Sequence, residues 1–297
     1  MKRAGAVSKR TVLSFYDDQM THHAAALTYY ALMSLFPAAL LALSLLGLFG
    51  QYPATYDAIV GYLRDVVPAS ALVPLDHSLR GALHSQSTAA TALAISVVFA
   101  LYGTTGALEA ARRALNVVLE VDGGRRFLRR KAIDVGSTFV LMALVLISLV
   151  LVFVGGSFAE DLLGFVGIGP QAARAWNAAR WPAALAVAML VFAYIYYVIP
   201  DVHQRSFRSV LPGAAFGVVL WLAASIGFSE YISQIEHVGA IYGTFTSAIL
   251  LVAWLWLTHV ALLFGAELNA EIERERLLGE GVAMDDTLSL PTRRGRW

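Results

Sequence analysis

The chain lacks cysteine and is poor in charge: its 297 residues include no Cys, and Asp, Glu, Lys and Arg together make up 14%. The absence of cysteine excludes disulfides, thiolate nucleophiles and cysteine-ligated zinc or iron–sulfur sites. An ordinary soluble domain is about 25% charged. The formal net charge of +1 gives no reason to expect a nucleic-acid partner. These shortages point away from an ordinary soluble protein.

Motifs for catalysis are missing as well. The sequence contains no HExxH, no GxSxG nucleophile elbow and no P-loop. Its histidines are dispersed, and the adjacent His22 and His23 would point about 100° apart on a helix. We therefore predict that the chain is not an enzyme and holds no metal and no cofactor.

The full sequence is 58% hydrophobic and contains several long uncharged runs. A membrane-spanning helix needs about 20 predominantly apolar residues. The strands of a membrane β-barrel alternate over only about 10 residues. The sequence therefore predicts an all-α polytopic membrane protein, a bundle of six transmembrane helices with short interfacial helices. The predicted spans are residues 24–50, 87–108, 135–159, 181–200, 209–229 and 238–266.

Lysine and arginine predict the orientation, because cytoplasmic loops carry the excess of these residues. They are concentrated before the first span, between the second and third, between the fourth and fifth, and after the sixth. Both termini are therefore predicted to be cytoplasmic. We expect residues 1–23 to be a cytoplasmic or interfacial segment with an amphipathic helix at 8–23, residues 24–278 to be the membrane domain, and residues 279–297 to be a disordered cytoplasmic tail.

Polar side chains near the cytoplasmic ends of the spans are the first candidates for a site, because ionisable groups in a membrane are costly and often mark pathways. Glu109, Asp134, Glu267 and Asn269 lie there. They are solvated or paired with nearby arginines in one interpretation, and line a polar vestibule in the other. His259 lies deeper in the sixth span. A hydrogen bond between helices is the commoner role for such a histidine, and a proton relay is the alternative.

Two further sets complete the candidates. Tyr102 and Tyr242 each begin a Tyr-Gly-Thr tripeptide, one in the second span and one in the sixth. Such a pair suits an inverted repeat, although the match is only three residues long. The loop between the second and third spans is basic, and could bind anionic lipid headgroups or simply fix the topology. Its residues are Arg125, Arg126, Arg129, Arg130 and Lys131.

Several segments resemble the YihY/BrkB family of bacterial inner-membrane proteins. They are residues 24–37, which end in Pro37, then Arg208 followed by Pro212-Gly213, and residues 242–270. The resemblance covers about residues 10–275 and implies an inner-membrane protein with six spans. Members of the family were once labelled ribonuclease BN, a label now regarded as mistaken, and lipid or solute export has been suggested for them.

Two functions remain open at this stage. The first is a transporter-like protein that moves a solute or lipid, or maintains the envelope, through a vestibule facing the cytoplasm. The second is a membrane scaffold that binds anionic lipid or a partner through the basic loop. Membrane lipids are the expected partners in both cases, nucleic acid is not, and the oligomeric state is left open.

Overall fold

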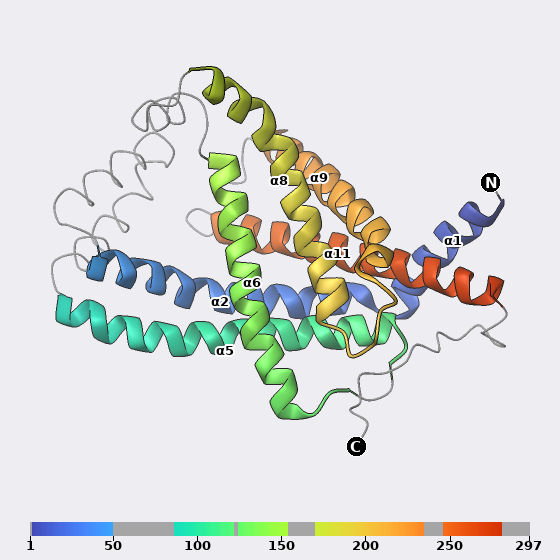
Figure 1. The fold of residues 1–297 in the computed structure, drawn as a ribbon, viewed down its shortest axis with the longest axis horizontal. Coiled ribbons are helices and arrows are strands. Elements are labelled where there is room, and N and C mark those ends of the chain that lie inside the picture. Colours follow the sequence, from blue (N-terminus) through green and yellow to red (C-terminus); the bar gives the residue numbers. More distant parts are fainter. Residues whose placement is uncertain (1, 50–85, 122–123, 154–169, 235–245, 281–297) are drawn as a thin grey trace. The chain divides into compact units, whose positions relative to one another are not determined.

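A computed structural model describes residues 2–49, 86–121, 124–153, 170–234 and 246–280. Nearly all of these residues are helical (Figure 1), which confirms the all-α prediction. Three predicted parts lie outside the described residues: residues 281–297 of the tail predicted at 279–297, the segment that contains Tyr242, and the end of the third predicted span. The elements are α1 (Lys2–Asp17), α2 (Met20–Phe49), α5 (Gln86–Val118), α6 (Phe127–Phe153), α8 (Pro170–Val198), the 3-10 helix η1 (Phe207–Val210), α9 (Leu211–Gln234) and α11 (Thr246–Gly279).

Among the described residues, four helices are long and apolar enough to cross a membrane. They contain the segments Phe127–Val152, Arg174–Val198, Phe207–Gln234 and Ala248–Gly279, of 26, 25, 28 and 32 residues. A helix needs about 20 residues to span the hydrocarbon core. The helices α2 and α5 have 30 and 33 residues, and their side chains are described only in part. The count of six spans therefore stays a prediction.

Helix ends differ from the predicted spans in a consistent way. The helix α8 begins at Pro170, well before the predicted residue 181, and α11 continues to Gly279, well past residue 266. Hydropathy marks only the part of a helix that lies in hydrocarbon, whereas the helix itself ends where backbone hydrogen bonding ends. The polar extensions of α5 and α11 carry the candidate site.

The surface of α6 has the character of a helix that faces lipid. Its exposed side chains include Phe139, Met142, Leu146 and Val150. Soluble proteins rarely expose contiguous apolar patches of this kind. Hydrocarbon, in contrast, accepts such a surface while the helix satisfies its own backbone hydrogen bonds.

The chain divides into two compact units. One unit comprises residues 29–107, and the other joins residues 1–28 to residues 108–297. In the smaller unit α2 and α5 run side by side (Figure 1). A Cβ added to Gly103 would lie 3.1 Å from the Cα of Ser34, and one added to Gly106 would lie 2.8 Å from the Tyr30 ring. These glycines allow the two helices to approach closely.

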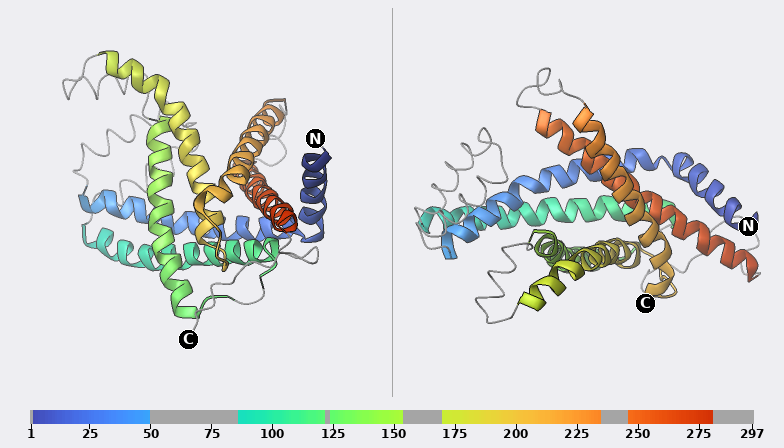
Figure 2. Two further views of the ribbon diagram at one scale, coloured as in Figure 1. Left: turned by 45° about the vertical axis from the view of Figure 1, so that its right-hand side comes forward. Right: turned by 90° about the horizontal axis from the view of Figure 1, so that it is seen from above.

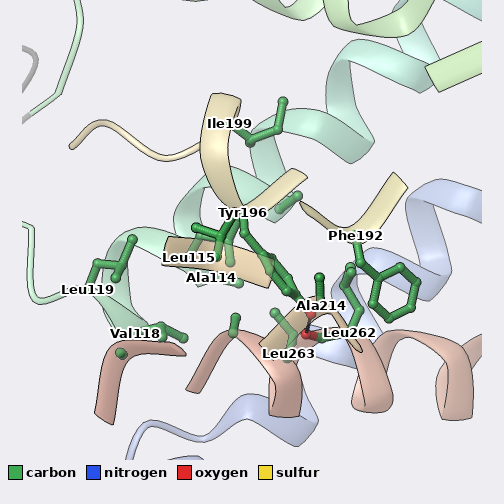
Figure 3. Close-up of a cluster of buried hydrophobic side chains, with 14 of the residues drawn as sticks. Ala114, Leu115, Val118, Leu119, Phe192, Tyr196, Ile199, Ala214, Leu262 and Leu263 are labelled. Carbon is green, nitrogen blue, oxygen red and sulfur yellow. Dashed lines mark hydrogen bonds between the residues drawn. The ribbon is translucent and has the colours of Figure 1, made fainter. Parts of the chain in front are cut away.

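The larger unit has its own apolar core, in which side chains of α5, α8, α9 and α11 meet (Figure 3). Tyr196 of α8 lies among them with 2% of its surface exposed, and its hydroxyl donates a 2.5 Å hydrogen bond to the carbonyl of Leu262. A buried tyrosine hydroxyl needs such a partner. The bond joins α8 to α11 at the centre of the core.

The N-terminal helix α1 packs against α11, and α9 lies against α11 along another side (Figure 2). The ring of Phe264 on α11 lies 5.1 Å from the ring of Phe15 on α1 and 6.0 Å from that of Phe216 on α9. The segment predicted to be one interfacial helix, residues 8–23, is helical but divided, because α1 ends at Asp17 and α2 begins at Met20. The buried face of α1 contacts α11, while Leu13 and Tyr16 are exposed.

Two glycines bring α9 and α11 into backbone contact. A Cβ on Gly265 would lie 2.6 Å from the carbonyl oxygen of Gly213 and 2.6 Å from the hydroxyl of Tyr196. Real side chains do not approach backbone atoms so closely. Close contact between small residues is how helices associate in lipid, where no hydrophobic effect draws them together.

We predict that Gly265→Ala destabilises the protein by about 1–3 kcal/mol, because the added methyl group overpacks the contact between α9 and α11. Thermal denaturation in detergent micelles measures the effect. The control is Gly227→Ala, since a Cβ at Gly227 on α9 meets nothing within 4 Å. This control should be neutral or stabilising by up to about 1 kcal/mol. Equal midpoints for both variants would contradict the proposed close contact.

Candidate functional site

A buried arginine organises the first group of polar side chains. The residue Arg112, on the extension of α5, has 1% of its surface exposed. Its guanidinium forms an ion pair with Asp134 of α6, bonds the Glu109 carboxylate at 2.8 Å, and donates to the carbonyl of Ile199 at 3.2 Å. Because a buried charge without a partner is costly, these contacts explain how an arginine can lie at this position. We call this group, with its further members Asn116, Arg125 and Asp201, the Arg112 cluster.

Arg125 completes the Arg112 cluster at the end of α8. It is 3% exposed and donates to the carbonyls of Val198 and Ile199 at 3.0 and 3.1 Å. The last carbonyls of a helix have no partner within the helix, so this guanidinium caps α8. It also lies 3.3 Å from the carboxylate of Asp201. The Asn116 amide donates to that carboxylate at 3.2 Å, and its oxygen accepts a hydrogen bond from the backbone N–H of Asp201 at 2.9 Å.

A second group of polar side chains, the Glu271 cluster, joins α1 to α11. Glu271 of α11 is 1% exposed and pairs with Arg10 of α1 at 3.0 Å, while Ser14 donates to it at 3.2 Å. Arg10 also reaches Glu275 at 2.6 Å. The remaining members of the cluster are Asp18, Glu120, Glu267 and Arg274, with Arg274 paired to both Glu120 and Glu271.

A third polar contact is made by Asn269, which joins α11 to the start of α9. Its side-chain oxygen accepts a hydrogen bond from the backbone N–H of Gly213 at 2.7 Å, and its amide donates to the carbonyl of Val210 at 2.9 Å. The first N–H groups of a helix have no internal partner, and Asn269 supplies one. A void of about 10 Å³ lies beside it, lined by Leu115, Val118, Leu119, Tyr196, Gln204, Val210, Ala266 and Asn269. Such a void has room for about one water molecule.

The histidine of the sixth predicted span joins two helices. The Nδ1 atom of His259 lies 3.1 Å from the hydroxyl of Thr28 on α2. This contact agrees with the interpretation of His259 as a histidine hydrogen-bonded between helices.

The predicted candidates are thus divided among several places. Glu109 and Asp134 meet at Arg112, as the pairing interpretation expects, whereas Glu267 belongs to the Glu271 cluster. Asp134 and Glu267 have 0% and 1% of their surface exposed, so neither is a solvated helix end. Tyr102 is 78% exposed and belongs to the smaller unit.

The basic loop is heterogeneous. Its first member, Arg125, is buried in the Arg112 cluster and does not present its guanidinium to a lipid headgroup. Arg126 and Arg129 are exposed, whereas Lys131 is half-buried. Arg130 lies 3.6 Å from the Glu109 carboxylate.

Sequence reasoning did not single out several members of the clusters. Arg10 and Arg274 lie in basic segments that serve only to predict the orientation, and Asp201 directly follows the fourth predicted span. The signal for Asp201 was available in its position, directly after Pro200 at a helix end, where free carbonyls attract cations. Nothing in the sequence marked Arg10 as a partner of residues near the opposite end of the chain. Among the described residues, no group of three or more His, Asp and Glu side chains is placed to hold a metal ion.

We predict that Arg112→Gln destabilises the protein by about 3–5 kcal/mol, because it leaves the carboxylates of Asp134 and Asp201 buried without a full partner. The control is Arg113→Gln, since the neighbouring Arg113 side chain is 75% exposed. An exposed ion pair contributes about 0–1 kcal/mol. Thermal denaturation in micelles compares the two variants, and equal losses would contradict the central role of Arg112.

Comparison with known proteins places the chain in a family. The family described as Virulence factor BrkB matches residues 11–287. The ribonuclease-like protein YfkH of Bacillus subtilis is 28% identical over 86% of this chain and 90% of its own length. A UPF0761 membrane protein of Pseudoalteromonas translucida is 28% identical over 88% of this chain and 84% of its own length.

Another relative, a UPF0761 membrane protein of Xanthomonas campestris, is 24% identical over 91% of this chain and 61% of its own length. No solved structure matches the chain. The family match extends from α1 to beyond α11, and several helices in that range are apolar enough to cross a membrane. The chain therefore belongs to the BrkB family and is a multi-pass helical membrane protein.

Proposed function

We propose that the protein moves a solute or a lipid across the bacterial inner membrane, through a path closed at its cytoplasmic end by the Arg112 and Glu271 clusters. The observation that carries this proposal is the burial of ionisable side chains within candidate membrane helices. Asp134 lies in the segment Phe127–Val152, and Glu267 and Glu271 lie in Ala248–Gly279. Such groups in membrane helices commonly belong to substrate or ion pathways.

Stability alone is a weak explanation for these clusters. Buried ion pairs often contribute no more than well-packed apolar residues of the same volume, because removing the charges from water is costly. The clusters have a property that apolar packing lacks, which is that partners can exchange. The guanidinium of Arg112 bonds Glu109 at 2.8 Å and lies 3.9 Å from Asp201. A network with alternative partners can hold two discrete arrangements, as a gate requires.

The void beside Asn269 fits a closed gate. Its lining residues at 115, 118 and 119 lie between Arg112 and Glu120 in the sequence. Arg112 belongs to one cluster and Glu120 to the other. With a volume of about 10 Å³ it admits no solute larger than water. Passage of a solute or a lipid headgroup would require the two clusters to separate.

A scaffold that binds anionic lipid is the second candidate, and the start of α6 favours it. Phe127 and Leu128 are 63% and 81% exposed, beside the exposed Arg126 and Arg129. Apolar and basic side chains together suit the boundary between lipid headgroups and acyl chains.

We propose no nuclease activity, in spite of the name of the Bacillus relative. Nucleases of the two-metal type need clustered carboxylates or histidines. Among the described residues no such cluster is present, and the sequence has no basic face with interleaved aromatics.

Native mass spectrometry of the full chain in nanodiscs of native lipid tests the transport proposal. We expect a small molecule or lipid that co-purifies reproducibly and is lost with Asp134→Asn, because the gate then no longer closes over its ligand. The matched control is Glu230→Gln, an exposed carboxylate on α9, which should retain the ligand.

The same measurement separates the two candidates. One outcome would support the scaffold and count against transport. In it, the double variant Arg126→Gln and Arg129→Gln loses bound anionic lipid, and no ligand is lost with Asp134→Asn. Arg174→Gln, an exposed arginine on α8, is the control for nonspecific loss of charge.

The proposed orientation places both termini in the cytoplasm. We expect fusions of a reporter that is active only in the cytoplasm to be active at the N-terminus and at the C-terminus. Alkaline phosphatase, which is active only outside the cytoplasm, should be inactive at both ends. Phosphatase activity at either end would contradict the orientation.

A further inference from the structure

The two clusters differ in their balance of charge. In the Arg112 cluster, the buried Arg112 and Arg125 face the buried carboxylates of Asp134 and Asp201. In the Glu271 cluster the carboxyl groups outnumber the guanidinium groups. Arg10 pairs with Glu271 and Glu275, and Arg274 pairs with Glu120 and Glu271.

Two carboxyl groups of that cluster are left in contact with each other. The Asp18 and Glu267 carboxyl groups are near enough to influence each other's protonation. Among the described residues no guanidinium forms an ion pair with either, although the charge of Arg274 acts on both. Glu267 is 1% exposed, and its Oε1 has no hydrogen-bond partner in the part of the chain that is described. An ionised carboxylate can only accept hydrogen bonds, so two of them cannot bond to each other. A bond between these side chains requires one proton.

The backbone fixes Asp18 in this position. Gln19, which links α1 to α2, has a φ of 54°, in the left-handed region that residues other than glycine rarely adopt. Its carbonyl accepts hydrogen bonds from the backbone N–H groups of His22 and His23, at 2.9 and 3.4 Å. The corner between the two helices, which carries Asp18, is therefore held by its own hydrogen bonds.

We propose that Asp18 and Glu267 form a proton-binding site in which two carboxyl groups share one proton. Glu267 holds the buried side of the site, and the half-buried Asp18 connects it to solvent. A proton suits this site better than a metal ion, because the described residues include no group of three or more ligating side chains. The inference needs no transported substrate and goes beyond the proposed function.

The surroundings favour uptake of a proton. Burial, followed by the negative charge of Glu120, raises the pKa of Asp18, while the contact with Glu267 and the positive charge of Arg274 oppose this shift without cancelling it. Burial also lowers the pKa of His23, so this neighbour supplies no compensating positive charge near neutral pH. The other titratable or charged groups that face the site are Arg10, Asp17, His22, Glu271, Arg274 and Glu275.

The sign of the effect follows from linkage. A group whose pKa is raised in the folded state binds its proton more tightly there, so it adds stability at low pH. That stability is lost as the pH rises from the ordinary aspartate value through the raised one. Above this window the two carboxylates repel each other, and the corner between α1 and α2 is held less firmly on α11.

Infrared difference spectroscopy of the full chain in nanodiscs tests the proposal. We expect the carbonyl stretching band of a protonated carboxylic acid, which disappears as the pH is raised. Glu267→Gln should abolish this titrating band, and Asp18→Asn should move its midpoint to lower pH. The wild-type thermal midpoint should fall over the same pH range, and that fall should be absent in Glu267→Gln.

Two controls and two contrary outcomes complete the experiment. Glu230→Gln on α9 and Arg174→Gln on α8, both at exposed positions, should leave the band and its midpoint unchanged. A band that titrates identically in Asp18→Asn and the wild type would overturn the proposal, even if Glu267→Gln fails to fold. Stabilisation by sodium ions at fixed pH, without any protonated carboxyl band, would also overturn it and indicate a cation site instead.

Discussion

Charges buried at helix ends must be paired, and this constraint shapes the larger unit more than any apolar contact. The guanidinium of Arg112 has almost no access to water, so it depends on Asp134, Glu109 and the carbonyl of Ile199. The guanidinium can have all of these partners only if α5, α6 and the end of α8 meet at Arg112. The orientation of these helices therefore depends on a few directional bonds, since contacts between apolar side chains in lipid have little directional preference.

The same logic explains why the close contact between α9 and α11 carries an asparagine. The glycines Gly213 and Gly265 bring the two backbones together, and Asn269 then satisfies the free N–H of Gly213 at the start of α9. A small residue and a polar residue thus act as a pair: the first permits the approach, and the second compensates the polar groups that the approach buries.

The sequence predicted the helical class and the approximate place of the described spans because hydropathy is a local property. It also singled out Glu109, Asp134 and Glu267 as polar residues beside apolar runs, and Asp134 and Glu267 lie within candidate membrane segments. It could not tell that Asp134 and Glu267 belong to different clusters, since that depends on which faces of α6 and α11 turn toward which neighbours. For the same reason the sequence could not predict the ion pair between Arg10 and Glu275, which lie 265 residues apart.

The bond between Arg10 and Glu275 has a consequence for the making of the protein. Synthesis proceeds from the N-terminus, and domains generally fold as units during it. Here α1 is made before its partners on α11, which leave the ribosome after every other described helix has emerged. The helix α1 must therefore wait undocked while the described helices between them are made. Docking of α1 on α11 thus cannot guide the insertion of the helices between them, and can only stabilise the arrangement that they have already reached.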